Sequence, residues 1–365
     1  MGLQVGKNPH LKVGDFCLAG ELESVTLARR ISYARMLTDD PELNRAGPMV
    51  YNSWGMSDSQ WSGGQAGADN GWTVQRIVQW TAGFFTRKAV DSPRLSAELL
   101  LSHVLGIARI KLYTDFDRLL SEPELTAYRA LVQRAAQHEP IAYLTGTAHF
   151  FNLEFQLNRE VLIPRPDSET LVENVLQLAR HEVGLESPRI LDLCTGSGCI
   201  AAALARHLNS AVVVATESSP AAAELARANI QRLGLAQRVS VELGDLFAPL
   251  KSMIDKRPFD LIVSNPPYIP TGRIADLPAN VRDYEPHMAL DGGVDGLDLH
   301  RRILAESAGY LADGGRIFLE IGFDQGPAAL EAAGAGGVAG WSEVRILKDS
   351  AGHDRVLAGR KGRGI

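Results

Sequence analysis

The chain has 365 residues, of which 45% are hydrophobic and 22% charged, and its formal net charge is -6. These values are typical of globular proteins, and the length allows two domains. The acidic balance argues against a protein that coats nucleic acid nonspecifically, because such a protein needs a basic surface. No apolar run reaches the length of a membrane span, and the first residues lack the pattern of a signal peptide.

Cysteine usage indicates a cytoplasmic protein. Cys17, Cys194 and Cys199 form an odd and sparse set, which fits a reducing cytosol better than a disulfide framework. No third or fourth ligand stands at suitable spacing from Cys194 and Cys199, so we expect no metal site.

Residues 1–70 are predicted to form a poorly ordered N-terminal extension. The stretch 49–71 is rich in Gly, Ser, Asn and Asp and has no sustained period. Met56 is an alternative native start. Gly63-Gly64-Gln65 lies in this stretch, and we interpret that tripeptide as a coincidence of composition.

Residues 71–145 are predicted to form a small all-α domain, because apolar residues recur there at helical spacing. A second helix begins after a Ser92 cap, with Pro93 at its first position. A third begins at a capping box of Ser121 and Glu124. The apolar face of the first helix is Val74, Ile77, Val78 and Phe85. That of the third helix is Leu125, Tyr128, Val132 and Ala135.

Residues 146–168 are predicted to be a hairpin or linker. The alternating, aromatic-rich stretch 148–157 favours a hairpin. It is followed by Leu162-Ile163-Pro164-Arg165-Pro166-Asp167, a stiff entry into a helix whose apolar face is Leu171, Val172, Val175 and Leu176.

Residues 169–365 alternate strands with helices, which predicts a doubly wound, mostly parallel sheet covered on both faces. We expect seven strands, beginning at Ile190, Val212, Val239, Phe259, Ile317 and Val344 and near Val356.

The first of these strands runs into a glycine-containing turn, residues 194–198, and then into a helix. Gly196 and Gly198 allow a ligand to approach the backbone near the helix N-terminus. Glu217 ends the second strand nineteen residues after Gly198, and an acid at this position can bind both hydroxyls of a ribose. Asp245, after the third strand, is placed to meet an adenine amino group. The turn alone also fits a dinucleotide fingerprint or a turn without a ligand.

Asn265-Pro266-Pro267-Tyr268 follows the fourth strand, and two prolines end any sheet ladder there. The Asn265 oxygen and the Pro266 carbonyl are suited to accept the two hydrogens of a planar –NH2 group, while the Tyr268 ring covers its plane. Since hydride transfer has no use for such a clamp, the pair of motifs favours a methyltransferase acting on nitrogen.

These motifs resemble the class I S-adenosylmethionine-dependent methyltransferases, and within them the HemK/PrmC branch. The resemblance spans roughly residues 72 to 360. Besides the turn and the Asn-Pro-Pro-Tyr motif, it rests on Leu162–Asp167, Val281-Arg282-Asp283-Tyr284-Glu285-Pro286, Asp291-Gly292-Gly293, Asp295-Gly296-Leu297-Asp298 and Asp354-Arg355-Val356.

The resemblance implies S-adenosyl-L-methionine as cofactor and the glutamine of the Gly-Gly-Gln motif of class I peptide chain release factors as substrate, recognised in part by the helical domain. We expect a monomer without direct nucleic-acid or membrane partners. The predicted site residues divide into three groups. Cofactor contacts are expected at Asp192, Cys194, Thr195, Gly196, Ser197, Gly198, Glu217, Asp245, Leu246 and Asn265; substrate contacts at Arg165, Asn265, Pro266, Pro267 and Tyr268; catalysis at Asn265, Pro266 and Tyr268.

Two departures from the family pattern concern the cofactor. Cys194 stands where the family usually has glycine, so the turn must accommodate a side chain, and Leu246 stands where some members carry an aromatic residue. Three alternatives stay open: a glutamine methyltransferase of a large-subunit ribosomal protein, a nucleic-acid exocyclic-amine methyltransferase, and a non-catalytic cofactor-binding protein.

Overall fold

The computed structural model of the protein describes residues 71–334 and 340–362. The predicted extension, with Cys17, Met56 and Gly63-Gly64-Gln65, lies outside the described residues. In the described part of the chain, no helix combines the length and the apolarity needed to cross a bilayer.

The first described elements are helices, and the predicted apolar faces of the first and third are buried. Glu124 accepts the Ser121 backbone N–H at 2.8 Å, as the capping box requires. Ser92 is the N-cap of the second helix and Pro93 its first residue, as predicted. Ser92 has φ +46° and caps through its carbonyl, which accepts Ser96 N–H at 2.9 Å, whereas its hydroxyl makes no capping bond. The helices are α2 (Val74–Arg87), α3 (Pro93–Leu105), α4 (Lys111–Thr114), α5 (Glu122–Ala135) and α6 (Ile141–Thr145).

The predicted hairpin is present as β1 (Thr147–Phe150) and β2 (Leu153–Gln156), joined by two residues of positive φ, Phe151 and Asn152. A turn of this kind matches the twist of the flanking strands. A 3-10 turn, η3 (Pro166–Ser168), then leads into α7 (Glu169–His181), whose expected apolar face is buried.

Seven strands form one sheet in the order β5-β4-β3-β6-β7-β9-β8, in which β3 to β7 pair in parallel and β9 runs antiparallel to both of its neighbours, β7 and β8. This confirms the doubly wound, mostly parallel sheet. The strands are β3 (Arg189–Leu193), β4 (Val212–Glu217), β5 (Val239–Leu243), β6 (Phe259–Ser264), β7 (Leu311–Glu320), β8 (Trp341–Lys348) and β9 (Asp354–Lys361).

The start of β7 lies earlier than the sequence predicted. Asp313-Gly314-Gly315 has the composition of a turn, but the structure places it in an irregular part of the strand where the register with β6 shifts.

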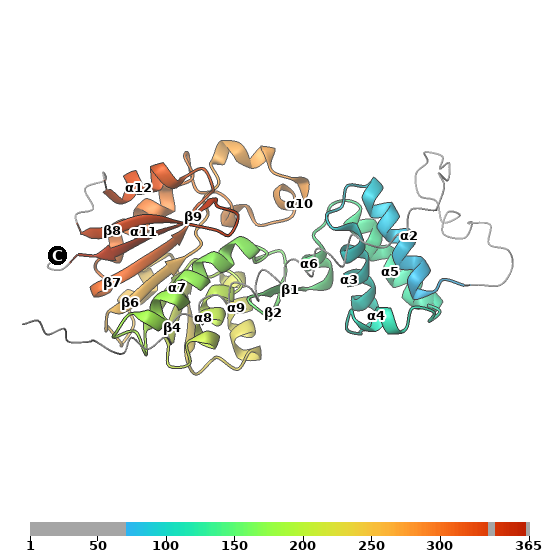
Figure 1. Cartoon of the computed structure of the whole chain (residues 1–365), viewed down its shortest axis with the longest axis horizontal. Coiled ribbons are helices and arrows are strands. Elements are labelled where there is room, and N and C mark those ends of the chain that lie inside the picture. Colours follow the sequence, from blue (N-terminus) through green and yellow to red (C-terminus); the bar gives the residue numbers. More distant parts are fainter. Residues whose placement is uncertain (1–70, 335–339, 363–365) are drawn as a thin grey trace, which may run out of the picture. The chain divides into compact units, whose positions relative to one another are not determined.

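Helices cover both faces of the sheet (Figure 1). Side chains alternate along each strand: Ile190 packs in one cluster with α7 and the helices of residues 199–207 and 220–232, whereas Leu191 packs in another with the helices of residues 298–307 and 326–334. The helices of this part are α8 (Cys199–His207), α9 (Pro220–Arg232), α10 (Ala279–Arg282), α11 (Asp298–Ser307) and α12 (Gly326–Gly334), with short turns η4 (Ala248–Lys251), η5 (Thr271–Asp276) and η6 (His287–Ala289).

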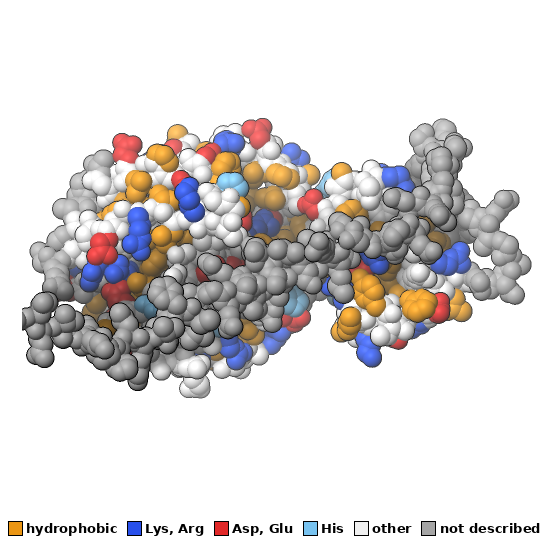
Figure 2. Space-filling view, viewed as in Figure 1, with side chains coloured by type: hydrophobic (Ala, Val, Ile, Leu, Met, Phe, Trp, Pro, Cys, Tyr) orange, Lys and Arg blue, Asp and Glu red, His pale blue; other side chains and the backbone are white. Residues whose placement is uncertain are grey.

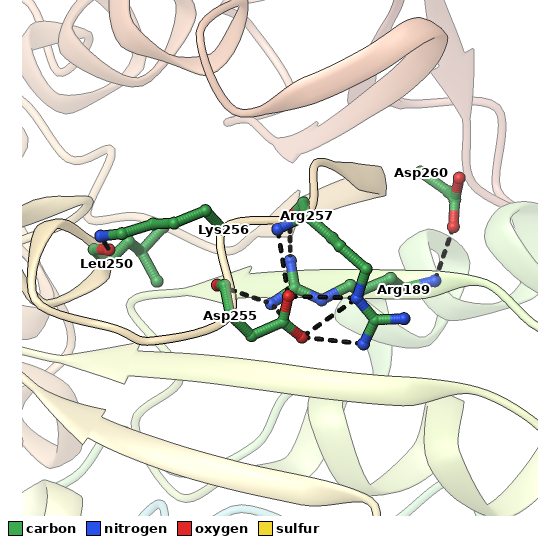
Figure 3. A network of polar contacts seen from close by, with 6 residues as sticks. All are labelled: Arg189, Leu250, Asp255, Lys256, Arg257 and Asp260. Carbon is green, nitrogen blue, oxygen red and sulfur yellow. Dashed lines mark hydrogen bonds and ion pairs between the residues drawn. The ribbon is translucent and has the colours of Figure 1, made fainter.

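A polar network fastens the amino ends of β3 and β6 (Figure 3). The Arg189 backbone N–H donates to Asp260 at 2.7 Å, and its guanidinium donates to the Arg257 carbonyl and lies 4.1 Å from the centre of the Phe259 ring. This network lies at the opposite ends of these strands from Asn265, so the carboxyl ends are left for a site.

Candidate active site

A pocket opens at the carboxyl ends of β3, β4 and β6, where the sequence placed the cofactor. Most of the predicted site residues line it. They are Arg165, Cys194, Thr195, Gly196, Ser197, Glu217, Asp245, Leu246, Asn265 and Pro267. The other four predicted residues are not part of the lining: Gly198, Pro266 and Tyr268 adjoin lining residues in the chain, and Asp192 lies two residues before Cys194.

Asp192 fastens the turn from behind. Its side chain is fully buried, and Oδ2 accepts from Thr195 Oγ1 at 2.6 Å and from the Ala201 backbone N–H at 3.2 Å. Burial raises the pKa of this carboxyl group to about 7. Asp192 therefore holds the first turn of α8 to the end of β3 and shapes the pocket through the turn.

The structure explains why a glycine suits position 194. Cys194 has φ +57°, in the left-handed region that glycine adopts readily and other residues at a cost. Its side chain packs against the core, and burial raises the pKa of the thiol to about 12, so the thiol is protonated and unreactive at neutral pH.

We expect Cys194→Gly to keep cofactor affinity and to raise the free energy of unfolding by about 1 kcal/mol, because it removes backbone strain. Cys194→Val, which is β-branched, should lower it by about 1–2 kcal/mol. Urea denaturation of both variants checks this, and equal stability of the two would show that the backbone here is unstrained.

Glu217 both supports the turn and faces the pocket. Its Oε2 accepts the Gly196 backbone N–H at 2.9 Å, and its Oε1 accepts the Ser219 backbone N–H at 2.9 Å. Oε1 also accepts the Ser218 hydroxyl at 3.4 Å. Oε2 therefore keeps a lone pair for one ligand hydroxyl, and a second hydroxyl can bind at Oε1 in place of Ser218.

Glu217→Gln is expected to weaken binding of S-adenosylhomocysteine about 10- to 100-fold, because a hydrogen bond to a charged acceptor contributes about 1.5–3 kcal/mol. Titration calorimetry measures this. The control is Glu224→Gln, an exposed glutamate on α9; equal affinities for the two variants would contradict a binding role for Glu217.

Asp245 and Leu246 form the next part of the wall. Asp245 is largely exposed, and its Oδ2 pairs with Arg302 at 2.6 Å. Leu246 is buried, with φ +44°, and lines the same pocket as Ile200 and Leu299. An apolar wall with an acid at its rim suits an adenine ring and its amino group, so the residues present fit S-adenosylmethionine.

Asn265 follows the last residue of β6, and its amide has a defined orientation. Nδ2 donates to Ser168 Oγ at 3.1 Å. Among the described residues, neither Asn265 Oδ1 nor the Pro266 carbonyl accepts a hydrogen bond. Both acceptors are therefore available to the two hydrogens of an incoming –NH2 group.

Tyr268 is anchored beneath this turn, where its hydroxyl donates to Glu320 Oε1 at 3.3 Å. Burial and the nearby Glu320 raise the pKa of Tyr268, so its hydroxyl stays protonated.

Arg165 is neutralised by Glu285. Its guanidinium pairs with this carboxylate, whose side chain is 1% exposed and which also accepts Ile163 N–H at 3.3 Å. Burial raises the pKa of Glu285, and Arg165 partly offsets that effect. The pair joins two motifs that lie about 120 residues apart. Substrate contact by Arg165 stays a prediction.

The loop after Tyr268 packs under the Asn-Pro-Pro-Tyr turn. Gly292 N–H donates to the Ile269 carbonyl at 2.9 Å, and Gln325 Nε2 donates to the Tyr268 carbonyl at 2.9 Å. A Cβ at Gly292 would lie 2.8 Å from the Pro267 oxygen, and one at Gly296 would overlap the Tyr268 oxygen. These glycines let two backbones approach each other.

Sequence reasoning missed three supporting residues. Ser168 reads as a helix-start serine, Gln325 as a surface amide, and Glu320 as the polar end of a strand. An acid directly after the buried run Ile317-Phe318-Leu319 was the available signal for Glu320.

A doubly wound sheet, a glycine turn after β3, an acid at the end of β4 and Asn-Pro-Pro-Tyr after β6 define a class I S-adenosylmethionine-dependent methyltransferase. Residues 76–146 match the family model of the PrmC N-terminal domain, and residues 167–277 match that of the methyltransferase small domain. The chain belongs to the release factor glutamine methyltransferase family.

The relatives carry this assignment. The chain is 45% identical to the release factor glutamine methyltransferase of Geobacter sulfurreducens, over 80% of this chain and 98% of the relative. It is 39% identical to that of Rhodopirellula baltica, with the same coverage. A solved protein-(glutamine-N5) methyltransferase (release factor-specific) from Alicyclobacillus acidocaldarius is 31% identical, over 57% of this chain and 99% of that chain, with a TM-score of 0.34.

Proposed function

We propose that the protein methylates the side-chain amide nitrogen of the glutamine in the Gly-Gly-Gln motif of class I peptide chain release factors. The observation that carries this is the orientation of Asn265: Ser168 occupies its amide nitrogen, and its oxygen is left for a donor at the pocket. The names of the relatives support the release factor as substrate.

The substrate amide nitrogen is a poor nucleophile, and residues of this chain activate it by positioning it. An amide nitrogen delocalises its lone pair into its carbonyl. Hydrogen bonds to Asn265 Oδ1 and the Pro266 carbonyl hold both hydrogens on one side, so the nitrogen can pyramidalise with its lone pair towards the cofactor. The cofactor, when bound, supplies a methyl group on a sulfonium. Positioning and preorganised acceptors provide the rate gain, and the proton leaves after transfer.

We propose a cytoplasmic monomer that acts on protein and not on nucleic acid. On the face drawn in Figure 2, basic and acidic side chains of the described residues lie interspersed. A nucleic-acid enzyme would need a basic groove, and the net charge of -6 argues against one.

The test is methyl transfer from labelled S-adenosylmethionine to purified release factor, with a Gln→Ala change in the factor's Gly-Gly-Gln motif as control. Label on the normal factor alone is the expected result. Label on neither, with cofactor still bound, would overturn the proposal and direct the search to ribosomal protein and then to nucleic acid.

A further inference from the structure

The serine that holds Asn265 has a second hydrogen bond to make. Ser168 is 2% exposed, and its Oγ accepts from Asn265 Nδ2 at 3.1 Å. A hydroxyl also carries one hydrogen to donate. The direction in which Ser168 donates decides whether Asn265 can keep its nitrogen towards Ser168 and its oxygen towards the substrate.

Glu320 is the buried acceptor next to Ser168. It ends β7, is fully buried, and its Oε1 accepts from the Tyr268 hydroxyl at 3.3 Å. Its other oxygen, Oε2, is buried and accepts no hydrogen bond of normal length from the described residues. The Ser168 hydroxyl is close enough to act on this carboxyl group and lower its pKa, so Ser168 is the donor at hand for the free oxygen.

The guanidinium of Arg355 lies close to the buried Glu320 carboxyl group. Arg355, at the start of β9, has a side chain only 9% exposed and pairs with Asp349 at 3.2 Å and more distantly with Asp167 at 3.7 Å. The Ile321 backbone N–H donates to the Arg355 carbonyl at 2.9 Å, which places this residue beside the end of β7. Burial raises the pKa of Glu320 to about 7, and Ser168, Arg355 and Tyr268 act in the opposite direction.

We propose that Glu320 and Ser168 are positioning residues: ionised Glu320 accepts the Ser168 hydroxyl, and this fixes the Asn265 amide with Oδ1 towards the substrate amide. The inference rests on the proposed function, since it assigns the orientation of the clamp that this function uses. Glu320 touches neither substrate nor cofactor in this scheme. Its second acceptor interaction, with Tyr268, holds the opposite end of the same turn.

The alternative orientation would be unproductive. If Ser168 donates to Asn265 instead, the asparagine rotates and presents its –NH2 to the substrate –NH2, so two donors face each other. Protonated Glu320 can donate to Ser168 and so allows this state. Activity should therefore rise with pH as Glu320 ionises. The ionisable groups that face Glu320 or its backbone are Asp167, Cys199, Tyr268, His300 and Arg355.

The first readout needs no release factor. In protein labelled with 15N-asparagine, the Asn265 side-chain signal, assigned by its absence in Asn265→Ala, should shift as pH rises from 5.5 to 8.5. In Glu320→Gln the shift should vanish, while the other asparagine signals stay as in the wild type. A signal that does not respond to pH in the wild type would overturn the inference.

The second readout is kinetic. Ser168→Ala and Glu320→Gln should each lower kcat for release factor about 10- to 100-fold, with the KM for S-adenosylmethionine within about twofold of the wild type. Glu320→Gln should also lose the acid limb of the kcat profile. The matched control is Ser307→Ala, another fully buried serine, which donates to the Ile303 carbonyl on α11; it should keep wild-type kcat.

Stability separates positioning from structural support. The folded-state pKa of Glu320 lies above its unfolded value, so its contribution to stability is greatest in acid and falls as pH rises towards and past 7. As pH rises from 5 to 8, the free energy of unfolding of Glu320→Gln should therefore rise relative to that of the wild type, although the variant has lost activity. Wild-type kcat in both variants would overturn the inference, whereas a wild type inactive on release factor would overturn only the proposed function.

Discussion

Asn265→Ala is expected to lower kcat for release factor methylation by about 1,000-fold, the largest effect we predict for a single side chain. In the proposed mechanism, Asn265 Oδ1 and the Pro266 carbonyl accept the two hydrogens of the substrate –NH2. The alanine removes one of these acceptors, and with it the hydrogen bond that orients the nitrogen lone pair towards the cofactor. Single-turnover transfer from labelled S-adenosylmethionine, at saturating release factor, measures the loss directly.

Measuring cofactor binding distinguishes a specific loss of methyl transfer in Asn265→Ala from damage to the pocket. S-adenosylhomocysteine should bind Asn265→Ala within about threefold of wild type, because the turn, Glu217 and the apolar wall stay in place. Asn174→Ala on α7, which removes an amide that donates to the Thr170 carbonyl, is the matched control and should keep full activity. Loss of cofactor binding together with transfer would count against a role for Asn265 in the chemical step.

The sequence predicted the sheet because its signals are local. Buried parallel strands read as apolar runs, and glycine turns and Pro-Pro mark their ends, so all seven strands were found. The early start of β7 was missed because Asp313-Gly314-Gly315 is a turn by composition, and only pairing with β6 keeps it in a strand.

The candidate site likewise has residues that the sequence predicted and residues that it did not. Residues that line the pocket follow strand ends, which a sequence shows. Residues that hold them do not: Ser168 meets Asn265 across 97 positions, and Glu285 meets Arg165 across 120. Such contacts depend on how η3 and the loop after Tyr268 fold over the sheet, and no local pattern encodes them.

A glycine in that loop gives the second large effect. Gly296→Ala is expected to lower kcat about 100-fold and the free energy of unfolding by about 2–3 kcal/mol. Gly296 has φ +80°, and its Cβ would overlap the Tyr268 carbonyl oxygen and crowd Gln325 Nε2. Because the obstacle is backbone, it cannot rotate away. The Tyr268 carbonyl must move, and the Pro266 acceptor moves with it.

Gly272→Ala is the matched control in the same loop. Gly272 has no positive φ, and a Cβ there would meet no atom within 4 Å, so kcat and stability should stay at wild-type values. Comparing the two by thermal unfolding and by methyl transfer tests whether the loop acts through contact with the turn. If Gly296→Ala transferred methyl groups at the wild-type rate, the Asn-Pro-Pro-Tyr turn would not need this support, and its geometry would have to be set by β6 and Ser168 alone.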